Sequence, residues 1–270
     1  MLTAYGIDSE DVKRGLPYTG DVADTAAPVP RRYQLPYRVR FDEAGPDGLL
    51  RSSGYLRYAQ DLAWQHSEAA GFDRAWYRER GLQWLVRCID LEIRDPLQYG
   101  AVVTVSTEVV GWRRVWARRR SEFRAGGGDL VSLAFIDWVL LNAEGRPARV
   151  PPAFADFFSD GTSFTPGHVI LAAPPDMAQT VGLRVRPQDL DPMGHVNNAT
   201  YLDYVEAACL DGGCADAVQG LPRRFRLEYV RSAQPGDELI ARTWPDEGGQ
   251  AVRLATADGE EILRARLGGR

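Results

Sequence analysis

The chain has 270 residues, of which 44% are hydrophobic and 26% charged, a composition typical of globular proteins and long enough for two modules. Its formal net charge of −5 argues against nucleic-acid binding, and no apolar run approaches the roughly 20 residues that cross a bilayer. The first residues show no secretory signal pattern, so we expect a cytoplasmic protein. Cys88, Cys209 and Cys214 lack paired-ligand spacing, and we expect neither disulfides, nor a metal, nor a cofactor.

Residues 1–35 carry scattered proline and glycine without a hydrophobic period, which predicts a weakly packed N-terminal extension. A first strand is predicted near residues 37–41. A long helix is predicted over 53–70, because apolar residues recur there at helical spacing and Gly71 can end it. The glycine run at 126–128 joins two strands as a hairpin turn and precedes no helix that would bind phosphate. The strands predicted after the helix are 82–93, 102–110, 114–123 and 130–141.

Proline-containing residues 147–180 connect this half to a second half with the same order of elements. The second half is predicted to contain a strand at 182–186, a helix at 198–210, and strands at 224–230, 238–244, 251–256 and 261–267. A strand, one long helix and an antiparallel meander define an α+β arrangement in which the sheet curls around the helix. Such a sheet exposes an edge, and pairing two copies buries it.

We therefore divide the chain into two modules, an extension and a linker. The predicted boundaries are 1–35 for the extension, 36–158 for the N-terminal module, 159–180 for the linker and 181–268 for the C-terminal module. The two modules would form a dimer within one chain.

An internal repeat supports this division. When Tyr55 is aligned with Tyr201, an offset of 146 residues (201 − 55), eight of the 21 positions from 38 to 58 are identical to those from 184 to 204. Ordinary composition gives about one or two such identities by chance. The chain therefore contains a duplicated unit.

The two copies differ where reactive groups would lie. The polar residues of the second copy, each followed by its counterpart in the first, are Asp191 and Gly45, His195 and Leu49, Asn197 and Arg51, and Asn198 and Ser52. This asymmetry predicts a catalytic C-terminal module joined to an N-terminal module with a degenerate site that holds substrate.

Residues 191–201, Asp-Pro-Met-Gly-His-Val-Asn-Asn-Ala-Thr-Tyr, resemble the Asp-x-x-x-His-Val-Asn-Asn-x-x-Tyr segment of the hotdog-fold thioesterases. The closer resemblance is to the double-hotdog acyl-acyl-carrier-protein thioesterases of plants and bacteria, since residues 60–71 and 82–87 are similar to that family's first helix and following strand. The resemblance covers roughly 36–268. It implies a tandem (double) hotdog, in which each half is a long helix wrapped by a curved antiparallel sheet.

The same resemblance implies an enzyme of fatty acid biosynthesis. Its expected reaction is hydrolysis of a fatty acyl thioester to free fatty acid and carrier thiol, with acyl carrier protein preferred over coenzyme A as the carrier. A monomer with an internal pseudo-dimer, or a homodimer of it, is expected. An acyl-coenzyme A thioesterase and a non-hydrolytic acyl-binding protein are the alternatives. A hydratase is a further interpretation, because Asp189-Leu190-Asp191-Pro192 loosely matches the hydratase Asp-x-Asn-Pro-x-His, although His195 falls one residue too late.

The chain departs from the plant members of this family at two places. Met193 stands where they have an asparagine two residues before the histidine. Ser232 and Ala233 stand where a glutamate and a cysteine follow their Leu-Glu-Tyr strand motif. The water-activating glutamate of the plant enzymes is therefore absent, and the remaining residues resemble the single-hotdog enzymes, in which an aspartate acts as nucleophile or base.

Thioester hydrolysis needs a group that activates water or attacks the carbonyl, and donors that hold the developing oxyanion. We expect Asp191 to be that base or nucleophile and His195 to orient the carbonyl or the water. Asn197 or Asn198 would supply a side-chain donor or fix the loop, and by analogy with the single-hotdog enzymes the backbone N–H at Asn198 would bind the oxyanion. The structural alternatives are a turn or capping role for Asp191 and a half-buried His195 held by a backbone carbonyl.

Three further features allow two interpretations each. Glu206 is either a second carboxylate of the site or, like its counterpart Gln60, a structural hydrogen-bonding residue. Six of the seven tryptophans lie in the N-terminal module and line an acyl tunnel or pack in the core. The arginines within 112–120 either dock an acidic partner or pair with the protein's own carboxylates.

Overall fold

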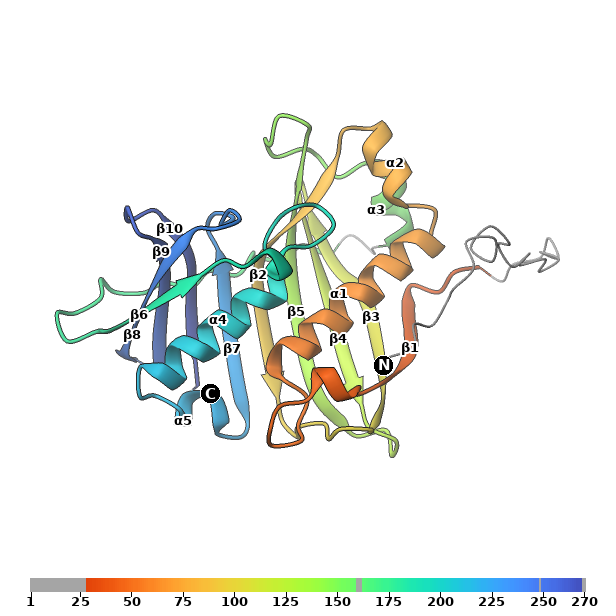
Figure 1. The fold of residues 1–270 in the computed structure, drawn as a ribbon. Coiled ribbons are helices and arrows are strands. Elements are labelled where there is room, and N and C mark those ends of the chain that lie inside the picture. The colour runs from red at the N-terminus through yellow and green to blue at the C-terminus, as the bar shows by residue number, and fades with distance from the viewer. Residues whose placement is uncertain (1–27, 159–161, 248, 269–270) are drawn as a thin grey trace, which may run out of the picture.

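The structure is a computed structural model that describes residues 28–158, 162–247 and 249–268. Most of the predicted extension therefore lies outside the described residues. Ten strands form one antiparallel sheet in the order β1-β3-β4-β5-β2-β7-β10-β9-β8-β6, with the long helices α1 and α4 packed on one side of it (Figure 1). The predicted tandem hotdog is confirmed.

The N-terminal module contains five strands and three α-helices. They are β1 (Arg32–Arg38), α1 (Ser52–Ala69), α2 (Arg74–Glu79), β2 (Gln83–Ile93), β3 (Val102–Arg113), β4 (Trp116–Arg124), β5 (Leu130–Leu141) and α3 (Pro152–Phe158). The C-terminal module repeats this plan with shorter elements. They are β6 (Gln179–Arg184), α4 (Asn198–Asp211), α5 (Asp216–Gln219), β7 (Arg223–Tyr229), β8 (Glu238–Asp246), β9 (Gly249–Thr256) and β10 (Glu261–Leu267). Two 3-10 turns, η2 (Phe41–Glu43) and η3 (Pro187–Asp189), precede the long helices.

The two edge strands begin earlier than predicted. β1 starts at Arg32 rather than near residue 37, and β6 starts at Gln179 rather than at 182. Both are held by pairing to a neighbouring strand, with Arg32 opposite Glu108 and Gln179 opposite Thr243. The sequence shows no hydrophobic period at these positions that would predict the pairing. The predicted extension and linker are each too long, because their last residues belong to the sheet.

The modules join edge to edge through β2 and β7, which pair antiparallel from Cys88 opposite Glu228 to Ile93 opposite Arg223. The helices α1 and α4 also contact each other. Arg57 on α1 donates to Asp203 on α4 at 3.0 Å, and these two residues are equivalent under the 146-residue offset. The pseudo-two-fold axis of the internal dimer therefore passes between the helices at this ion pair.

The duplication extends to individual hydrogen bonds. In each copy a turn is closed by an amide-to-carbonyl bond of 2.8 Å, and a helix tyrosine accepts a bond of 2.9 Å from a loop amide. The equivalent pairs are Gly45–Leu49 and Asp191–His195 for the turns, and Tyr55–Leu97 and Tyr201–Ala233 for the tyrosines. Identical scaffolds thus present different side chains at the same turn.

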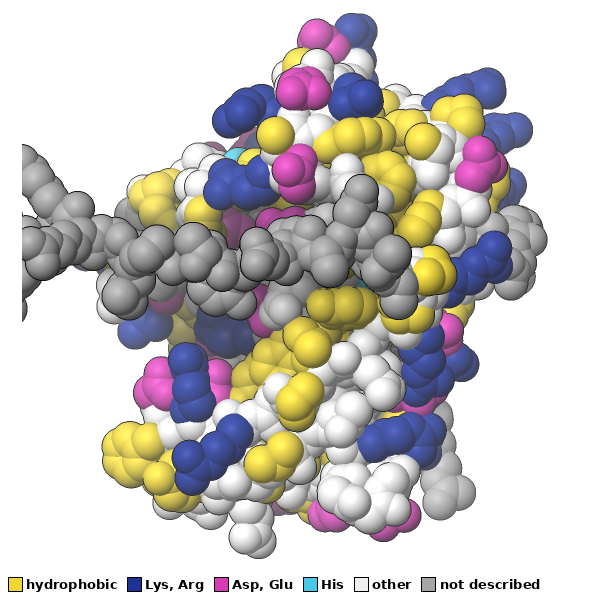
Figure 2. Space-filling view, turned by 90° about the vertical axis from the view of Figure 1, so that its right-hand side faces the viewer, with side chains coloured by type: hydrophobic (Ala, Val, Ile, Leu, Met, Phe, Trp, Pro, Cys, Tyr) yellow, Lys and Arg dark blue, Asp and Glu magenta, His cyan; other side chains and the backbone are white. Residues whose placement is uncertain are grey.

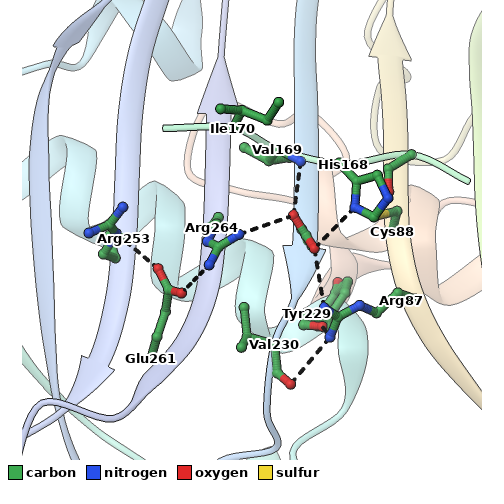
Figure 3. A network of polar contacts seen from close by, with 12 residues as sticks. Arg87, Cys88, His168, Val169, Ile170, Tyr229, Val230, Arg253, Glu261 and Arg264 are labelled. Carbon is green, nitrogen blue, oxygen red and sulfur yellow. Dashed lines mark hydrogen bonds and ion pairs between the residues drawn. The ribbon is translucent and has the colours of Figure 1, made fainter. Parts of the chain in front are cut away.

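The segment between the modules crosses the outer face of the sheet. The amide of Gly167 donates to Asp137 at 2.7 Å, and the amide of Val169 donates to Glu228 at 2.9 Å. Figure 3 shows Arg87, Arg264 and His168 converging on one carboxylate. Their ion pairs identify it as that of Glu228, which is 3% exposed. The segment is therefore fixed to both modules by buried carboxylates.

Most of the arginines on the outer face of the sheet pair with the protein's own carboxylates. Arg118 makes a two-point contact with Asp137 at 2.6 and 2.7 Å, and Arg120 bonds Glu108. Figure 2 views the molecule from the side on which β1 lies and shows basic and acidic side chains interspersed on that surface. For Arg118 and Arg120 the internal-pairing interpretation is confirmed. Within the described segments, no helix is long and apolar enough to span a membrane, and no group of three metal-ligating side chains was found.

Candidate active site

A cavity of about 110 Å³ lies at the junction of the two modules. Helix α1 and strand β2 of the N-terminal module form one wall, and the Asp191 turn, α4 and the end of β7 form the other. The lining residues that matter for the chemistry come from both walls and are Gln60, Trp84, Asp191, His195, Asn198 and Ser232. Neither module encloses the cavity alone.

Asp191 is both a turn residue and a cavity residue. Its Oδ1 accepts the amide of Met193 at 2.8 Å and that of His195 at 3.4 Å. Its Oδ2 has no hydrogen-bond partner among the described residues, and the side chain is partly exposed to the cavity. The predicted turn role of Asp191 therefore applies to Oδ1, whereas Oδ2 is available for chemistry.

His195 lies half-buried in the cavity wall, and its ring makes no hydrogen bond within the described part of the chain. The structural alternative, in which a backbone carbonyl holds the ring, therefore does not apply among the described residues. Its counterpart in the N-terminal module, Leu49, has no polar group. An imidazole without a fixed partner can bond a substrate carbonyl or a water molecule.

The two asparagines have separate places. Asn197 is the N-cap of α4, since its Oδ1 accepts the amide of Ala199 at 2.9 Å, and it does not line this cavity. Asn198 does line the cavity, and its carbonyl accepts the Tyr229 hydroxyl at 2.8 Å. No acceptor for the Asn198 amide lies among the described residues. The predicted oxyanion donor is therefore free.

Sequence reasoning missed Gln60. This residue projects from α1 of the N-terminal module into the cavity opposite Asp191, and its amide has no hydrogen-bond partner in the described residues. Its counterpart Glu206 is not part of this cavity. Glu206 lies near Ser52 and Arg223, where burial, only partly opposed by those two groups, raises the pKa of its carboxyl to about 7. The pseudo-two-fold axis thus places Gln60 at the polar turn and Glu206 at the degenerate one, and the interpretation of Glu206 as a second carboxylate of the site is wrong.

A smaller aromatic cavity of about 40 Å³ adjoins the first and lies within the N-terminal module. The two cavities share the walls formed by Trp64, Trp84 and Trp138, and Tyr77 and Phe154 line the inner part. Of the other tryptophans, Trp76 and Trp112 pack against an apolar cluster around Phe158. Trp64 and Trp84 pack against the same cluster as well as lining the cavities. Core packing is thus confirmed for these four tryptophans, and an acyl tunnel stays a prediction.

On the helix side, the site opens into an outer groove that shares Gln60, Asp191 and Met193 with the cavity. The exposed side chain of Met193 stands at this opening, where the plant enzymes have asparagine. A substrate arm from solvent can thus reach Asp191 without displacing the core.

A long helix wrapped by a curved antiparallel sheet, present twice and carrying one polar turn at the junction, defines the class of double-hotdog proteins. The family profiles of the acyl-ACP thioesterase N-terminal domain and C-terminal domain match residues 30–158 and 173–267. The chain belongs to the acyl-ACP thioesterase family.

Among curated relatives, oleoyl-acyl carrier protein thioesterase 1, chloroplastic, of Arabidopsis thaliana is 25% identical over 199 residues, covering 64% of this chain and 53% of the relative. The chain thus spans about half the length of that plant protein. The structure of 12:0-ACP thioesterase from Umbellularia californica has a TM-score of 0.75 at 22% identity, covering 89% of this chain and 98% of that one. An acyl-ACP thioesterase from Bacteroides thetaiotaomicron gives 0.76 at 19% identity, with the same coverage. These structural likenesses show the fold.

Proposed function

We propose that the protein hydrolyses a fatty acyl thioester, with acyl-acyl-carrier-protein as the substrate, to free fatty acid and carrier thiol. The observation that carries the proposal is Asp191, whose Oδ2 has no partner among the described residues and which lines a cavity that adjoins an aromatic pocket. Family membership and the names of the relatives support acyl carrier protein as the carrier. Cytoplasmic location and the choice between monomer and homodimer stay predictions.

In the proposed reaction, Asp191 takes a proton from a water molecule whose oxygen attacks the thioester carbonyl carbon. The carbonyl oxygen becomes negatively charged and accepts the free amide of Asn198 at the start of α4, where the helix dipole also favours negative charge. The C–S bond then breaks, and the thiolate leaves and takes up a proton. Since a thiolate leaves readily, the site needs no strong acid.

His195 and Gln60 complete the site from opposite modules. The unpartnered ring of His195 can bond the carbonyl or the water, and the Gln60 amide can hold the water against Asp191. Ser232 lines the cavity at the position of the plant glutamate. Gln60 and Gln83 of the N-terminal module also line it, and Gln60, which borders the outer groove together with Asp191, is the one we assign to orient water in its stead.

Two alternatives differ in their support. A non-hydrolytic acyl-binding protein is favoured by the missing glutamate and by the use of Asp191 Oδ1 within its own turn. The hydratase interpretation is contradicted, because Asp189 is 4% exposed and is bonded by Arg186 and the Tyr204 hydroxyl, away from the cavity. Acyl-coenzyme A remains the alternative substrate.

Release of free thiol from acyl-carrier-protein and acyl-coenzyme A thioesters tests the proposal. Asp191→Asn should lower kcat by about 10²- to 10⁴-fold with the fold intact, because the neutral amide keeps the turn bonds and cannot accept the proton. Asp47→Asn is the matched control, since Asp47 Oδ1 caps the equivalent turn by accepting the amide of Leu49 at 3.0 Å. No thiol release from any thioester would contradict the proposed function. Equal rates for the wild type and Asp191→Asn would remove Asp191 as the base.

A further inference from the structure

Arg119 on β4 is a buried cation at the wall of the inner aromatic cavity. The residue is 6% exposed, and it lines that cavity together with Tyr77, Ser67 and Trp138. Its neighbours in sequence, Arg118 and Arg120, point to the outer face of the sheet and pair with carboxylates there. Arg119 thus points inward because side chains alternate along a strand.

The hydrogen-bond partners of Arg119 are all neutral. Its Nη1 bonds His66 Nδ1 at 3.2 Å and Thr107 Oγ1 at 3.4 Å, and its Nη2 bonds the Ser67 hydroxyl at 3.3 Å. Burial and the adjacent Arg119 lower the pKa of His66 to about 4, so this ring is neutral at pH 7 and supplies no negative charge. No carboxylate of the described residues lies within ion-pair distance of Arg119.

A guanidinium carries five N–H donors, and these contacts use three of them. The two that remain are the Nε donor and one on Nη2. These atoms form the edge that binds a carboxylate at two points, and Arg118 uses the same two atoms on Asp137. The indole Nε1 of Trp138, on the wall shared by both cavities, is also buried without a partner in the described segments.

A buried charge without a counter-ion is costly, and buried charges in proteins are paired as a rule. The chain supplies carboxylates to Arg118 and Arg120 on the outer face, yet the described residues supply none to Arg119 inside the cavity. A ligand that enters past the three tryptophans would meet this guanidinium at the end of its path.

We propose that the two adjoining cavities together bind an acyl chain whose far end carries a carboxylate, and that Arg119 in the inner cavity binds this group. The substrate class is then the thioester of an α,ω-dicarboxylic acid joined to the carrier through one end. This inference rests on the proposed function, because it uses the site at Asp191 for the thioester end of the same chain.

Matched thioesters test the inference. At each length from six to twelve carbons, one acyl chain ends in a methyl group and the other in a carboxylate, on the same carrier. We expect kcat/KM to favour the carboxylate end by about 10- to 100-fold at the length that reaches Arg119, as for hydrogen bonds to a charged group. Arg119→Met should reverse this preference, whereas the neighbouring control Arg120→Met should keep it. Hydrolysis with a preference for methyl ends at every length would overturn the inference and leave the proposed function standing.

A binding measurement separates the two proposals and needs no variant. Calorimetry on the wild type should show tighter binding of a free α,ω-dicarboxylate than of the monocarboxylate of equal length, by a similar factor. If no thioester is hydrolysed but the dicarboxylate binds in this way, the proposed function fails and the Arg119 site stands. If the two acids bind equally, the inference fails even where Arg119→Met does not fold.

Discussion

At the scale of single residues, the candidate site and its degenerate copy differ in the side chains that stand at equivalent positions. Gln60 and Glu206 occupy the same place on equivalent helices, and only Gln60 faces the turn that kept its polar groups. An amide can donate to and accept from one water molecule without competing with Asp191 for its proton. The polar set of the site therefore depends on both copies.

Replacing Gln60 tests this arrangement. Gln60→Ala should lower kcat about tenfold, since the loss of one neutral hydrogen bond to the reacting water costs about 1 kcal/mol or slightly more. Gln60→Glu should also change the pH–rate profile, because a second carboxylate beside Asp191 raises the pKa of the pair. The control is Gln65→Ala, five residues further along α1, where Gln65 bonds Asp61 at 2.7 Å. A Gln60→Ala enzyme with wild-type kcat would remove Gln60 from the mechanism.

At the scale of elements, the degenerate site leaves a titrating group in α4. Burial raises the pKa of Glu206 to about 7, above its ordinary value of 4.5, so the folded state favours the neutral acid. This contribution to stability is fully present below pH 4.5 and is lost as pH rises through 7.

Glu206→Gln should therefore leave the free energy of unfolding nearly unchanged at pH 4.5 and raise it by about 2 kcal/mol at pH 8, relative to the wild type. Urea unfolding at the two pH values measures this difference. Asp211→Asn, an exposed residue at the end of the same helix, is a suitable control and should show no such gain at pH 8. A gain for Glu206→Gln that is equal at both pH values would show that packing, rather than ionisation, causes it.

The sequence predicted the long elements closely, because a helix such as α1 (Ser52–Ala69) and a strand such as β5 (Leu130–Leu141) carry a full hydrophobic period. The short helices α2, α3 and α5 contain too few residues for such a period and were missed. In the site, Asp191, His195 and Asn198 were predicted because the other copy lacks them. Gln60 and Arg119 were not, since their roles depend on packing across the modules and on the inward face of one strand.

At the scale of the whole molecule, the two modules share one sheet and one main apolar core that contains residues of both α1 and α4. The buried carboxylate of Glu228 on β7 joins the parts, since it bonds Arg87 of the N-terminal module, Arg264 of β10 and the amide of Val169 in the connecting segment. Such a continuous structure should unfold in a single cooperative step.

Glu228→Ala tests this coupling. The change leaves two arginines and a backbone amide without their shared partner, and breaking a buried ion pair in this way costs about 3–5 kcal/mol. We expect calorimetry to show one transition for both the wild type and the variant, shifted to a lower Tm in the variant. Glu261→Ala is the control, because Glu261 also pairs with Arg264 but is 23% exposed, and its loss should cost about 1 kcal/mol or less. Two separate transitions, with only that of the C-terminal module shifted in Glu228→Ala, would show that the modules fold independently and that the cavity between them is assembled afterwards.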